Sequence, residues 1–367
     1  MFDRRLIRYF DWGLLTMTLL LGIIGIVTLY SAVTTGSHPA QEILYIKQLI
    51  WYCAGLVIMV ILFSFDYKLL ERWAYAIYIM GISLLVCVLL FGKYVGGSKR
   101  WLGLGPVSIQ PSELVKIAVI IILARCYAKL VNIDGITLRE LIKPFILMAI
   151  PFVLIVRQPD LGTAMLIFLI AASMTIFVKI KRRSLMCLIG TGLIVALTGW
   201  FFLKGYQKQR ILTFLNPDRD PLGTGYHVIQ SKIAIGSGMI FGKGLFKGTQ
   251  NTLSFLPEQH TDFIFSVLAE ELGFAGSLFT ILLFLVLIVW GLNIAHRCRD
   301  PFGAVMSVGV TSIIFWQVFI NIGMVMGLMP VVGVPLPLIS YGGSSMITVM
   351  IGIGILMNVS MRRFMVE

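Results

Sequence analysis

Long apolar runs recur along this 367-residue chain and restrict its fold more than any other feature. Each run holds about 17–25 residues, enough to cross the roughly 30 Å hydrocarbon core of a bilayer as a helix. Backbone groups in lipid must be satisfied within the element itself, which favours helices. Composition agrees, because 58% of the residues are hydrophobic and only 13% are charged. The sequence therefore predicts an all-α, polytopic integral membrane protein, with residues 1–367 forming one transmembrane domain.

Ten stretches are predicted to span the membrane. The first follows Arg4, Arg5 and Arg8, and with about 20 apolar residues it is too long for a cleaved signal peptide, so we expect a retained anchor. The ten stretches are residues 13–33, 47–65, 74–92, 113–130, 144–157, 162–178, 184–203, 263–291, 304–328 and 340–359.

The distribution of basic residues predicts the orientation. With the N-terminus inside, seventeen Lys and Arg residues fall on cytoplasmic segments, against five on the short outer segments. This asymmetry satisfies the positive-inside rule and predicts a multi-pass protein of the cytoplasmic (inner) membrane with both termini cytoplasmic. The net charge of +13 is explained by this placement, so we expect membrane lipids and no nucleic acid as partners. The five cysteines indicate neither a disulfide framework nor a zinc site.

Residues 204–261 form a large extracytoplasmic loop between the seventh and eighth predicted spans. The loop is too long for a simple connector and contains eight glycines and seven Lys or Arg. Its apolar pieces, Ile229–Ile235 and Met239–Phe246, argue against disorder, and they either dip into the membrane surface or cover a cavity. The eighth apolar run continues to Ala295, and about 33 residues at 1.5 Å each give roughly 50 Å. It must therefore tilt, protrude, or break near Gly273 and Gly276.

The end of this loop carries the acidic residue that we single out, Asp262. Thr261 or Asp262 has the residue type and the place of a helix N-cap. The other interpretation is that Asp262 is a general base, because a carboxylate within reach of a hydroxyl can accept its proton. The two roles are not exclusive.

Charged residues in and beside the predicted spans suggest binding of an anionic head group. Glu113 and Lys116 share one face of the fourth span, either as a mutual ion pair or with Lys116 on a substrate anion. Arg100 has the planar fork that suits phosphate, and Asp160 either caps the sixth span or borders the site. We also expect a substrate-binding role for the polar loop residues Gln207, Arg210, His260 and Thr261. These features suit an amphiphile with an anionic head and an apolar tail.

Several motifs in this order resemble those of the SEDS family (shape, elongation, division and sporulation), over essentially the whole chain. Within that family the chain resembles the elongation members more than the division members, both in its short N-terminal tail and in the sequence of residues 257–262. The motifs are Gln110–Glu113, Gln158–Gly162, Asp220–Gly223, Tyr226–Gly236, His260–Phe263 and Pro335–Gly343.

The resemblance implies a peptidoglycan glycosyltransferase that polymerises lipid II at the outer face of the membrane during cell elongation. It implies that Asp262 is catalytic, that Glu113 and Lys116 line the cavity, and that a class B penicillin-binding protein and the elongation machinery are partners. Asp262 would take the proton from the acceptor sugar, and undecaprenyl pyrophosphate would leave the undecaprenyl-linked glycan with inversion. Lys116, Arg100, Gln207 and Arg210, with Mg²⁺ or Mn²⁺ as a possible cofactor, would hold the pyrophosphate.

Three alternatives stay open at this point. A lipid II flippase would explain the lipid-linked substrate without any polymerisation. A division paralogue would carry out the same chemistry in another process. A non-catalytic scaffold would only position a penicillin-binding protein.

Overall fold

The computed structural model describes residues 9–34, 43–95, 98–104, 107–130, 135–202, 205–216, 224–252 and 259–362. A helix occupies each of the ten predicted stretches. These helices are α2 (Trp12–Thr34), α3 (Ile43–Ser64), α4 (Lys68–Phe91), α5 (Pro111–Leu130), α6 (Leu138–Arg157), α7 (Leu161–Phe177), α8 (Arg182–Phe202), α12 (Ile264–Arg297), α13 (Pro301–Val325) and α14 (Gly343–Arg362).

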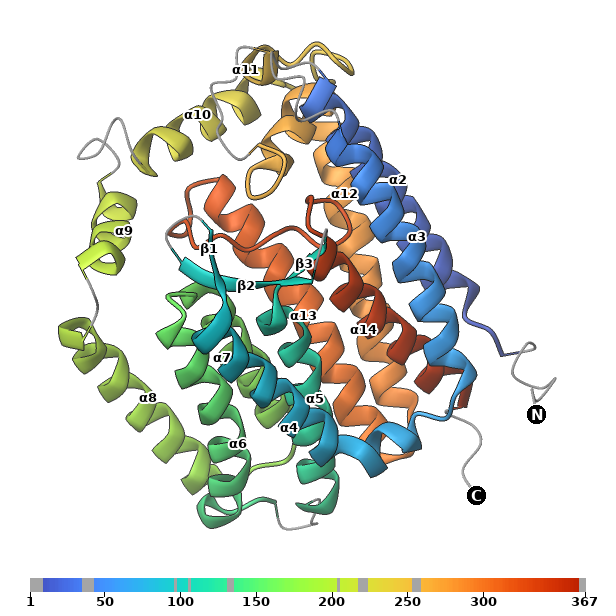
Figure 1. Ribbon diagram of the computed structural model, residues 1–367, viewed down its shortest axis with the longest axis vertical. Helices are drawn as coiled ribbons and strands as arrows, with labels where there is room; N and C mark the ends of the chain where they lie inside the picture. The colour runs from blue at the N-terminus through green and yellow to red at the C-terminus, as the bar shows by residue number, and fades with distance from the viewer. Residues whose placement is uncertain are drawn as a thin grey trace.

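Six helices of the described part, α2, α3, α4, α12, α13 and α14, are long and apolar enough to cross a membrane. The polytopic helical membrane class is confirmed, whereas the full number of crossings stays a prediction. The beginning of α2 and the end of α14 lie together, because Ser360 Oγ donates to Asp11 Oδ2 at 2.7 Å. Trp290 near the end of α12 also donates to Asp11. Asp262 lies just before the start of α12 and therefore toward the opposite end of the bundle. We call this end the Asp262 end (Figure 1).

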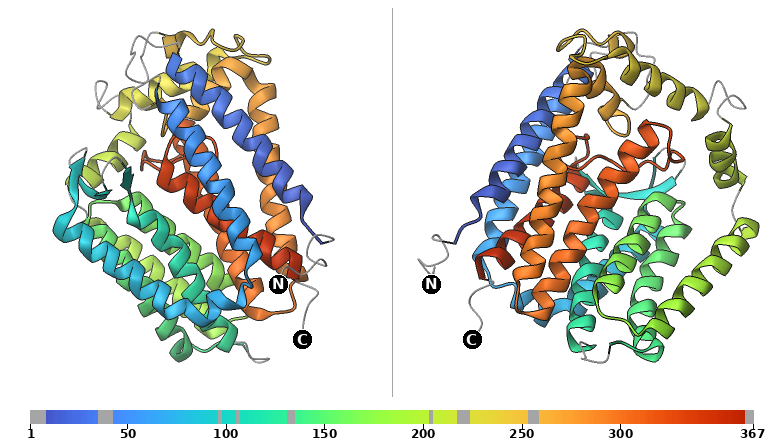
Figure 2. Two further views of the ribbon diagram at one scale, coloured as in Figure 1. Left: turned by 45° about the vertical axis from the view of Figure 1, so that its right-hand side comes forward. Right: turned by 180° about the vertical axis from the view of Figure 1, so that it is seen from behind.

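The centre of the bundle is formed by α5, α13 and α14 (Figures 1 and 2). In the most apolar 18-residue stretch of α13 and of α14, 72% and 89% of the residues are buried. In α3, α4 and α12 the corresponding share is 22–28%. The outer helices thus present their apolar side chains outward, as expected of helices that face lipid. Hydroxyls inside the central helices, such as those of Ser307, Thr311 and Thr348, donate to the carbonyl four residues earlier. This bond satisfies them without a partner on another helix.

A small antiparallel sheet lies between α4 and α5, with strands β1 (Lys93–Val95), β2 (Ser98–Leu104) and β3 (Val107–Ile109) in the order β1-β2-β3. Its register pairs Lys93 with Trp101 and Leu102 with Ile109. The all-α prediction omitted this sheet because its strands are too short to show a clear alternating pattern. The sheet carries Arg100 across the Asp262 end of the bundle.

The long loop folds into helices α9 (Gly205–Leu215), α10 (Thr224–Ser237) and α11 (Thr249–Thr252). They lie at the Asp262 end of the bundle (Figure 1). Helix α10 is fastened to the bundle through Ser231, whose hydroxyl lies 2.8 Å from Ser266 Oγ and donates to Val325 O at 2.7 Å. The loop is therefore a folded part of the protein in the ranges that the structure describes.

Helix α12 is broken at Gly273, where φ is 68° and ψ is −164°, which is one of the three outcomes that its length allowed. Only glycine adopts this region readily. The backbone groups freed by the break bond to the loop segment 239–244. The carbonyls of Glu270 and Glu271 accept from the N–H groups of residues 243 and 244. The N–H groups of residues 274 and 275 donate to the carbonyls of residues 239 and 240.

Candidate active site around Asp262

Asp262 lies in the turn 259–263 that directly precedes α12. Helix α12 begins at Ile264 and its N-cap is Phe263, which makes no side-chain capping bond. The prediction that Thr261 or Asp262 caps this helix is therefore wrong. The reason is that turns continue through residue 263 before the helix begins.

Three successive carbonyl groups hold this turn. The carbonyl of His260 accepts from Tyr341 N at 2.9 Å, that of Thr261 from Ser340 Oγ at 2.6 Å, and that of Asp262 from Asn321 Nδ2 at 3.0 Å. Since the backbone is fixed at each step, the direction of the Asp262 Cα–Cβ bond is fixed with it, and this limits the positions that the carboxylate takes.

A glycine lies directly beside the Asp262 carboxylate. Gly333 has φ 73°, and a Cβ atom placed on it would lie 3.4 Å from Asp262 Oδ2. Gly333 is exposed and Asp262 is partly exposed. The carboxylate thus lies at the protein surface beside a residue that has no side chain to cover it.

Gly333 belongs to the segment 326–342 between α13 and α14, which we call the α13–α14 loop. Asn321 joins this loop to the Asp262 turn, because its amide also donates to Val334 O at 2.8 Å. Within the loop, Leu336 N donates to Ser340 Oγ at 2.8 Å. Gln48 of α3 donates to Ser340 O at 3.1 Å and accepts from Gly342 N at 3.2 Å. The two buried amides, Asn321 and Gln48, were missed from the sequence, where their only signal is a polar residue in or beside an apolar run.

His260 and Thr261 contribute to this arrangement through their backbone carbonyls, as given above. The His260 ring also lies 6.1 Å from the ring of Tyr341, centroid to centroid. Burial raises the pKa of the Tyr341 phenol above its ordinary value.

Asp160 is a helix cap with additional partners. It is the N-cap of α7, and its carboxylate accepts from Thr163 N at 3.2 Å and from Gln110 Nε2 at 3.0 Å. Arg100 donates to Pro159 O, and its guanidinium lies 3.8 Å from Asp160 Oδ1. The capping interpretation of Asp160 is confirmed, and Arg100 is brought to it by β2.

The Asp160 cluster and Asp262 border the same loop. A Cβ atom placed on Gly162, two residues after Asp160, would lie only 2.6 Å from Val332 O. Val332 precedes Gly333, the neighbour of Asp262. The α13–α14 loop therefore lies between the two clusters and fixes their relative position.

Glu113 and Lys116 form a buried ion pair, with Lys116 Nζ 2.8 Å from Glu113 Oε2. Lys116 is 0% exposed and Glu113 is 4% exposed. The ion-pair interpretation therefore describes this structure. A direct contact between Lys116 and a substrate stays a prediction.

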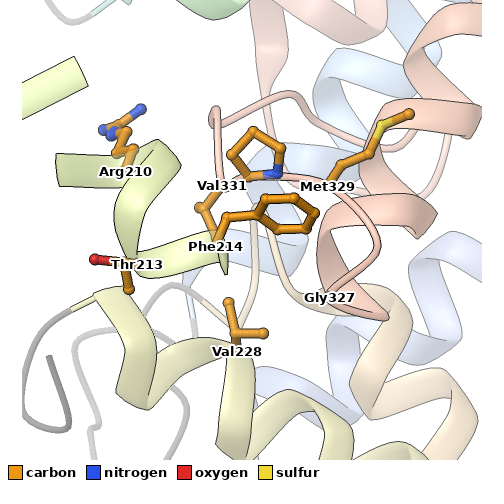
Figure 3. A pocket seen from close by; sticks show the side chains of 8 residues that line it. Arg210, Thr213, Phe214, Val228, Gly327, Met329 and Val331 are labelled. Atoms are coloured by element: carbon orange, nitrogen blue, oxygen red, sulfur yellow. The ribbon is translucent and has the colours of Figure 1, made fainter. Parts of the chain in front are cut away.

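A shallow pocket that is partly open to solvent lies between α9, α10 and the α13–α14 loop. Its lining residues are Arg210, Thr213, Phe214, Val228, Gly327, Met329, Pro330 and Val331. Figure 3 shows Arg210 at the edge of this pocket and Phe214 against the loop that carries Met329 and Val331. The predicted residue Gln207 lies one turn before Arg210 on α9 and is buried.

A second cation, which the sequence analysis did not single out, accompanies Arg210. A Cβ atom on Gly327 would lie 2.6 Å from Lys232 Nζ, so the exposed Lys232 of α10 reaches over the α13–α14 loop. Lys232 lies inside the motif Tyr226–Gly236, which was the available signal. Arg210 and Lys232 thus border the loop a few residues before Gly333.

Among the described residues, no group of three or more His, Cys, Asp and Glu side chains is placed to hold a metal ion. Mg²⁺ in proteins is commonly bound through one or two carboxylates together with substrate phosphates. Asp262 is a carboxylate of that kind, so a cation held here would take most of its ligands from a phosphorylated substrate.

Comparisons with known proteins agree on one family. A family model described as "FTSW_RODA_SPOVE: Cell cycle protein" matches residues 11–364. The peptidoglycan glycosyltransferase MrdB of Escherichia coli is 45% identical over 371 residues, covering 98% of this chain and 97% of that protein. The solved RodA of Thermus thermophilus has a TM-score of 0.71 at 28% identity, covering 97% of this chain and 98% of that chain. A chain from a peptidoglycan synthase complex that coordinates polymerization and crosslinking gives 0.82 at 29% identity with the same coverage.

Proposed function

The chain belongs to the FtsW, RodA and SpoVE family of cell cycle proteins and is a peptidoglycan glycosyltransferase of cell elongation, and we propose that Asp262 is its general base. One observation carries this proposal. Three candidate carboxylates border or lie near the α13–α14 loop, but Glu113 and Asp160 are only 4% and 3% exposed. Only Asp262 of the three keeps its side chain partly open to solvent.

The proposed reaction joins two lipid-linked sugars. The Asp262 carboxylate accepts the proton of the GlcNAc 4-hydroxyl of lipid II while that oxygen attacks the anomeric carbon of the terminal MurNAc of the growing chain. The new oxygen–carbon bond forms as the bond to the pyrophosphate oxygen breaks, and undecaprenyl pyrophosphate leaves with inversion. A base positioned for such a proton transfer contributes about 10²–10⁴-fold to the rate.

The leaving group gains negative charge in this step, and Arg210 and Lys232 are suited to stabilise it. Arg210 lines the pocket together with Val331, two residues before Gly333, and Lys232 lies against Gly327, six residues before Gly333. Six residues of extended chain span at most about 20 Å. We therefore place the pyrophosphate along the loop segment that leads from these cations to the base. Fixed charges placed where charge develops lower the barrier without reorganisation.

The remaining candidate residues have a supporting role in this proposal. The Asp160–Arg100 cluster joins β2 and Gln110, the residue before α5, to the start of α7, whose Gly162 packs against Val332 of the α13–α14 loop. The Glu113–Lys116 pair neutralises two buried charges within α5. Arg100 is the member of this set with an accessible side chain, 31% exposed, so it is the one suited to a further phosphate contact.

A divalent cation would supply additional charge neutralisation at the pyrophosphate. We propose Mg²⁺ or Mn²⁺ bound mainly by the two phosphates, with Asp262 as the protein carboxylate nearest to them. The protein's own part in the reaction is to position the acceptor oxygen and take its proton.

The setting of the reaction follows from the family. One of the solved structures most like this chain comes from a synthase complex that couples polymerization to crosslinking. This supports a penicillin-binding protein of class B, a transpeptidase, as the partner here. The joined ends of α2 and α14 support termini on one side of the membrane. We place that side in the cytoplasm and Asp262 at the outer face of the inner membrane.

The test is polymerisation of labelled lipid II by purified protein together with its partner. Asp262→Asn keeps the size of the side chain and removes its basicity, so it should lower the rate by about 10²–10⁴-fold. Asp66→Asn is the matched control, because Asp66 is an exposed acid of the α3–α4 turn. Wild-type rates from Asp262→Asn would refute the base assignment. A wild-type protein that moves lipid II across vesicles without forming polymer would instead support a flippase.

A further inference from the structure

A short apolar segment projects from the Asp262 end of the protein. Met239, Ile240 and Phe241 follow α10, and their exposed fractions are 81%, 61% and 84%. We call these three residues the tip. Three successive large apolar side chains this exposed are unusual on a protein surface that faces only water.

The tip is held outward by a rigid base. Lys243 Nζ lies 2.6 Å from Glu270 Oε1, and the same oxygen accepts from Thr249 N at 2.9 Å and from Gln250 N at 3.2 Å. The tip backbone itself bonds to α12, through Phe274 N to Met239 O at 2.8 Å and Ala275 N to Ile240 O at 3.0 Å. The exposure of the tip is therefore built into the fold.

These bonds also fix the depth of the tip relative to the membrane. The tip is attached where α12 resumes at Phe274 after its break, and from there α12 continues to Arg297. At 1.5 Å per residue this part of α12 is about 36 Å long, slightly more than the roughly 30 Å hydrocarbon core. Phe274 and the tip therefore lie at the membrane boundary on the Asp262 side.

The exposed apolar surface of α12 continues from the tip into this span. Phe274, Leu278 and Phe279 are 63%, 42% and 54% exposed. Helix α12 crosses the membrane, so these side chains face the acyl chains. The tip adjoins this lipid-facing surface, because its backbone bonds to the first residues of the span, 274 and 275.

We propose that the tip inserts into the lipid bilayer, at the boundary between head groups and acyl chains, in the leaflet on the Asp262 side. Ile240 and Phe241 are side chains of the kind that interfacial segments bury at this boundary. The inserted tip would hold the long loop at a constant height above the acyl chains. The same loop is fastened to α12 and leads into the Asp262 turn.

Site-directed fluorescence on the full chain tests this proposal. The variant Ile240→Cys carries an environment-sensitive dye, and the protein is placed in nanodiscs without any partner. Lipids with a doxyl group near the head of the acyl chain are the quencher. Background labelling is prevented by replacing the three exposed cysteines with serine, Cys53, Cys87 and Cys187.

Two sites on the same molecule calibrate the signal. Leu278→Cys on α12 marks a side chain within the bilayer, and Lys247→Cys marks a loop side chain directed to the aqueous phase. The dye at Ile240→Cys should show a blue-shifted emission and lose most of its intensity with the shallow quencher, as a membrane site does. Emission as red and as little quenched as at Lys247→Cys would overturn the proposal.

A second variant separates insertion from a contact with protein. Phe241→Asp should remove the blue shift of a dye at Ile240→Cys, because a charged side chain beside it withdraws the tip from lipid. If quenching by lipid is absent in nanodiscs and the blue shift appears only when the partner protein is added, the tip is a protein-docking surface and the lipid proposal is wrong.

Discussion

Replacing Asn321 by leucine is expected to disable the enzyme without unfolding it. The Asn321 amide is 0% exposed and donates two bonds, to Asp262 O at 3.0 Å and to Val334 O at 2.8 Å. It is the side chain of α13 that ties the Asp262 turn to the α13–α14 loop. Leucine has a similar size but no donor, so both ties are lost together.

The magnitude can be worked from these contacts. Each carbonyl left without a donor in a buried site costs about 1–3 kcal/mol. Asn321 Oδ1 has no hydrogen-bond partner, and removing this unpaired acceptor offsets one of the two costs. The net loss of unfolding free energy is then about 1–3 kcal/mol, which a membrane protein of this size should tolerate. The effect on activity should be larger, because a catalytic group displaced by about 1 Å can lose about 10²-fold in rate.

The assay is lipid II polymerisation together with thermal unfolding in detergent, and Gln317→Leu is the matched control. Gln317 lies one turn earlier on α13 and is also 0% exposed, and neither of its amide atoms has a hydrogen-bond partner among the residues that the structure describes. Gln317→Leu should therefore keep or raise the melting temperature and keep the activity. If both variants lose activity equally, the bonds of Asn321 to the Asp262 turn are not what supports catalysis. Wild-type polymerisation by Asn321→Leu would refute the reasoning altogether.

Three further outcomes are expected. Arg210→Ala and Lys232→Ala should each lower kcat/KM for lipid II about tenfold or more, since a bond to a charged group contributes about 1.5–3 kcal/mol; equal loss in Lys247→Ala, outside the pocket, would show only a general charge effect. Gly273→Ala should abolish accumulation of folded protein, because a Cβ atom there would lie 2.2 Å from a backbone nitrogen at φ 68°, whereas Gly190→Ala, with nothing within 4 Å, should express normally. Chelation of divalent cations should slow polymerisation and leave the melting temperature unchanged if the cation arrives with the pyrophosphate, while a lowered melting temperature without substrate would indicate a cation bound by the protein alone.

Sequence patterns predicted the features that depend on the chain locally. The length of an apolar run decides whether a helix crosses a bilayer, and a helix occupies each of the ten predicted stretches. The same argument predicted that α12 would tilt, protrude or break near Gly273 and Gly276, and the structure has the break at Gly273. The motif resemblance predicted the family and selected Asp262. The small sheet and the helix cap were mispredicted, because short strands and the first turn of a helix depend on one or two residues of local geometry.

The sequence by itself determined the membrane class and the family and selected Asp262 as the candidate base, because apolar runs and short motifs consist of contiguous residues. Only the tertiary structure decided what holds Asp262, since Ser340 bonds to Thr261 across 79 residues of sequence. Asn321 and Gln317 show the limit most clearly. Both are buried amides on the same helix, yet one joins two loops and the other has no hydrogen-bond partner in the described part of the chain. The difference lies in which backbone carbonyls the fold brings within 3 Å, and a sequence does not contain that distance.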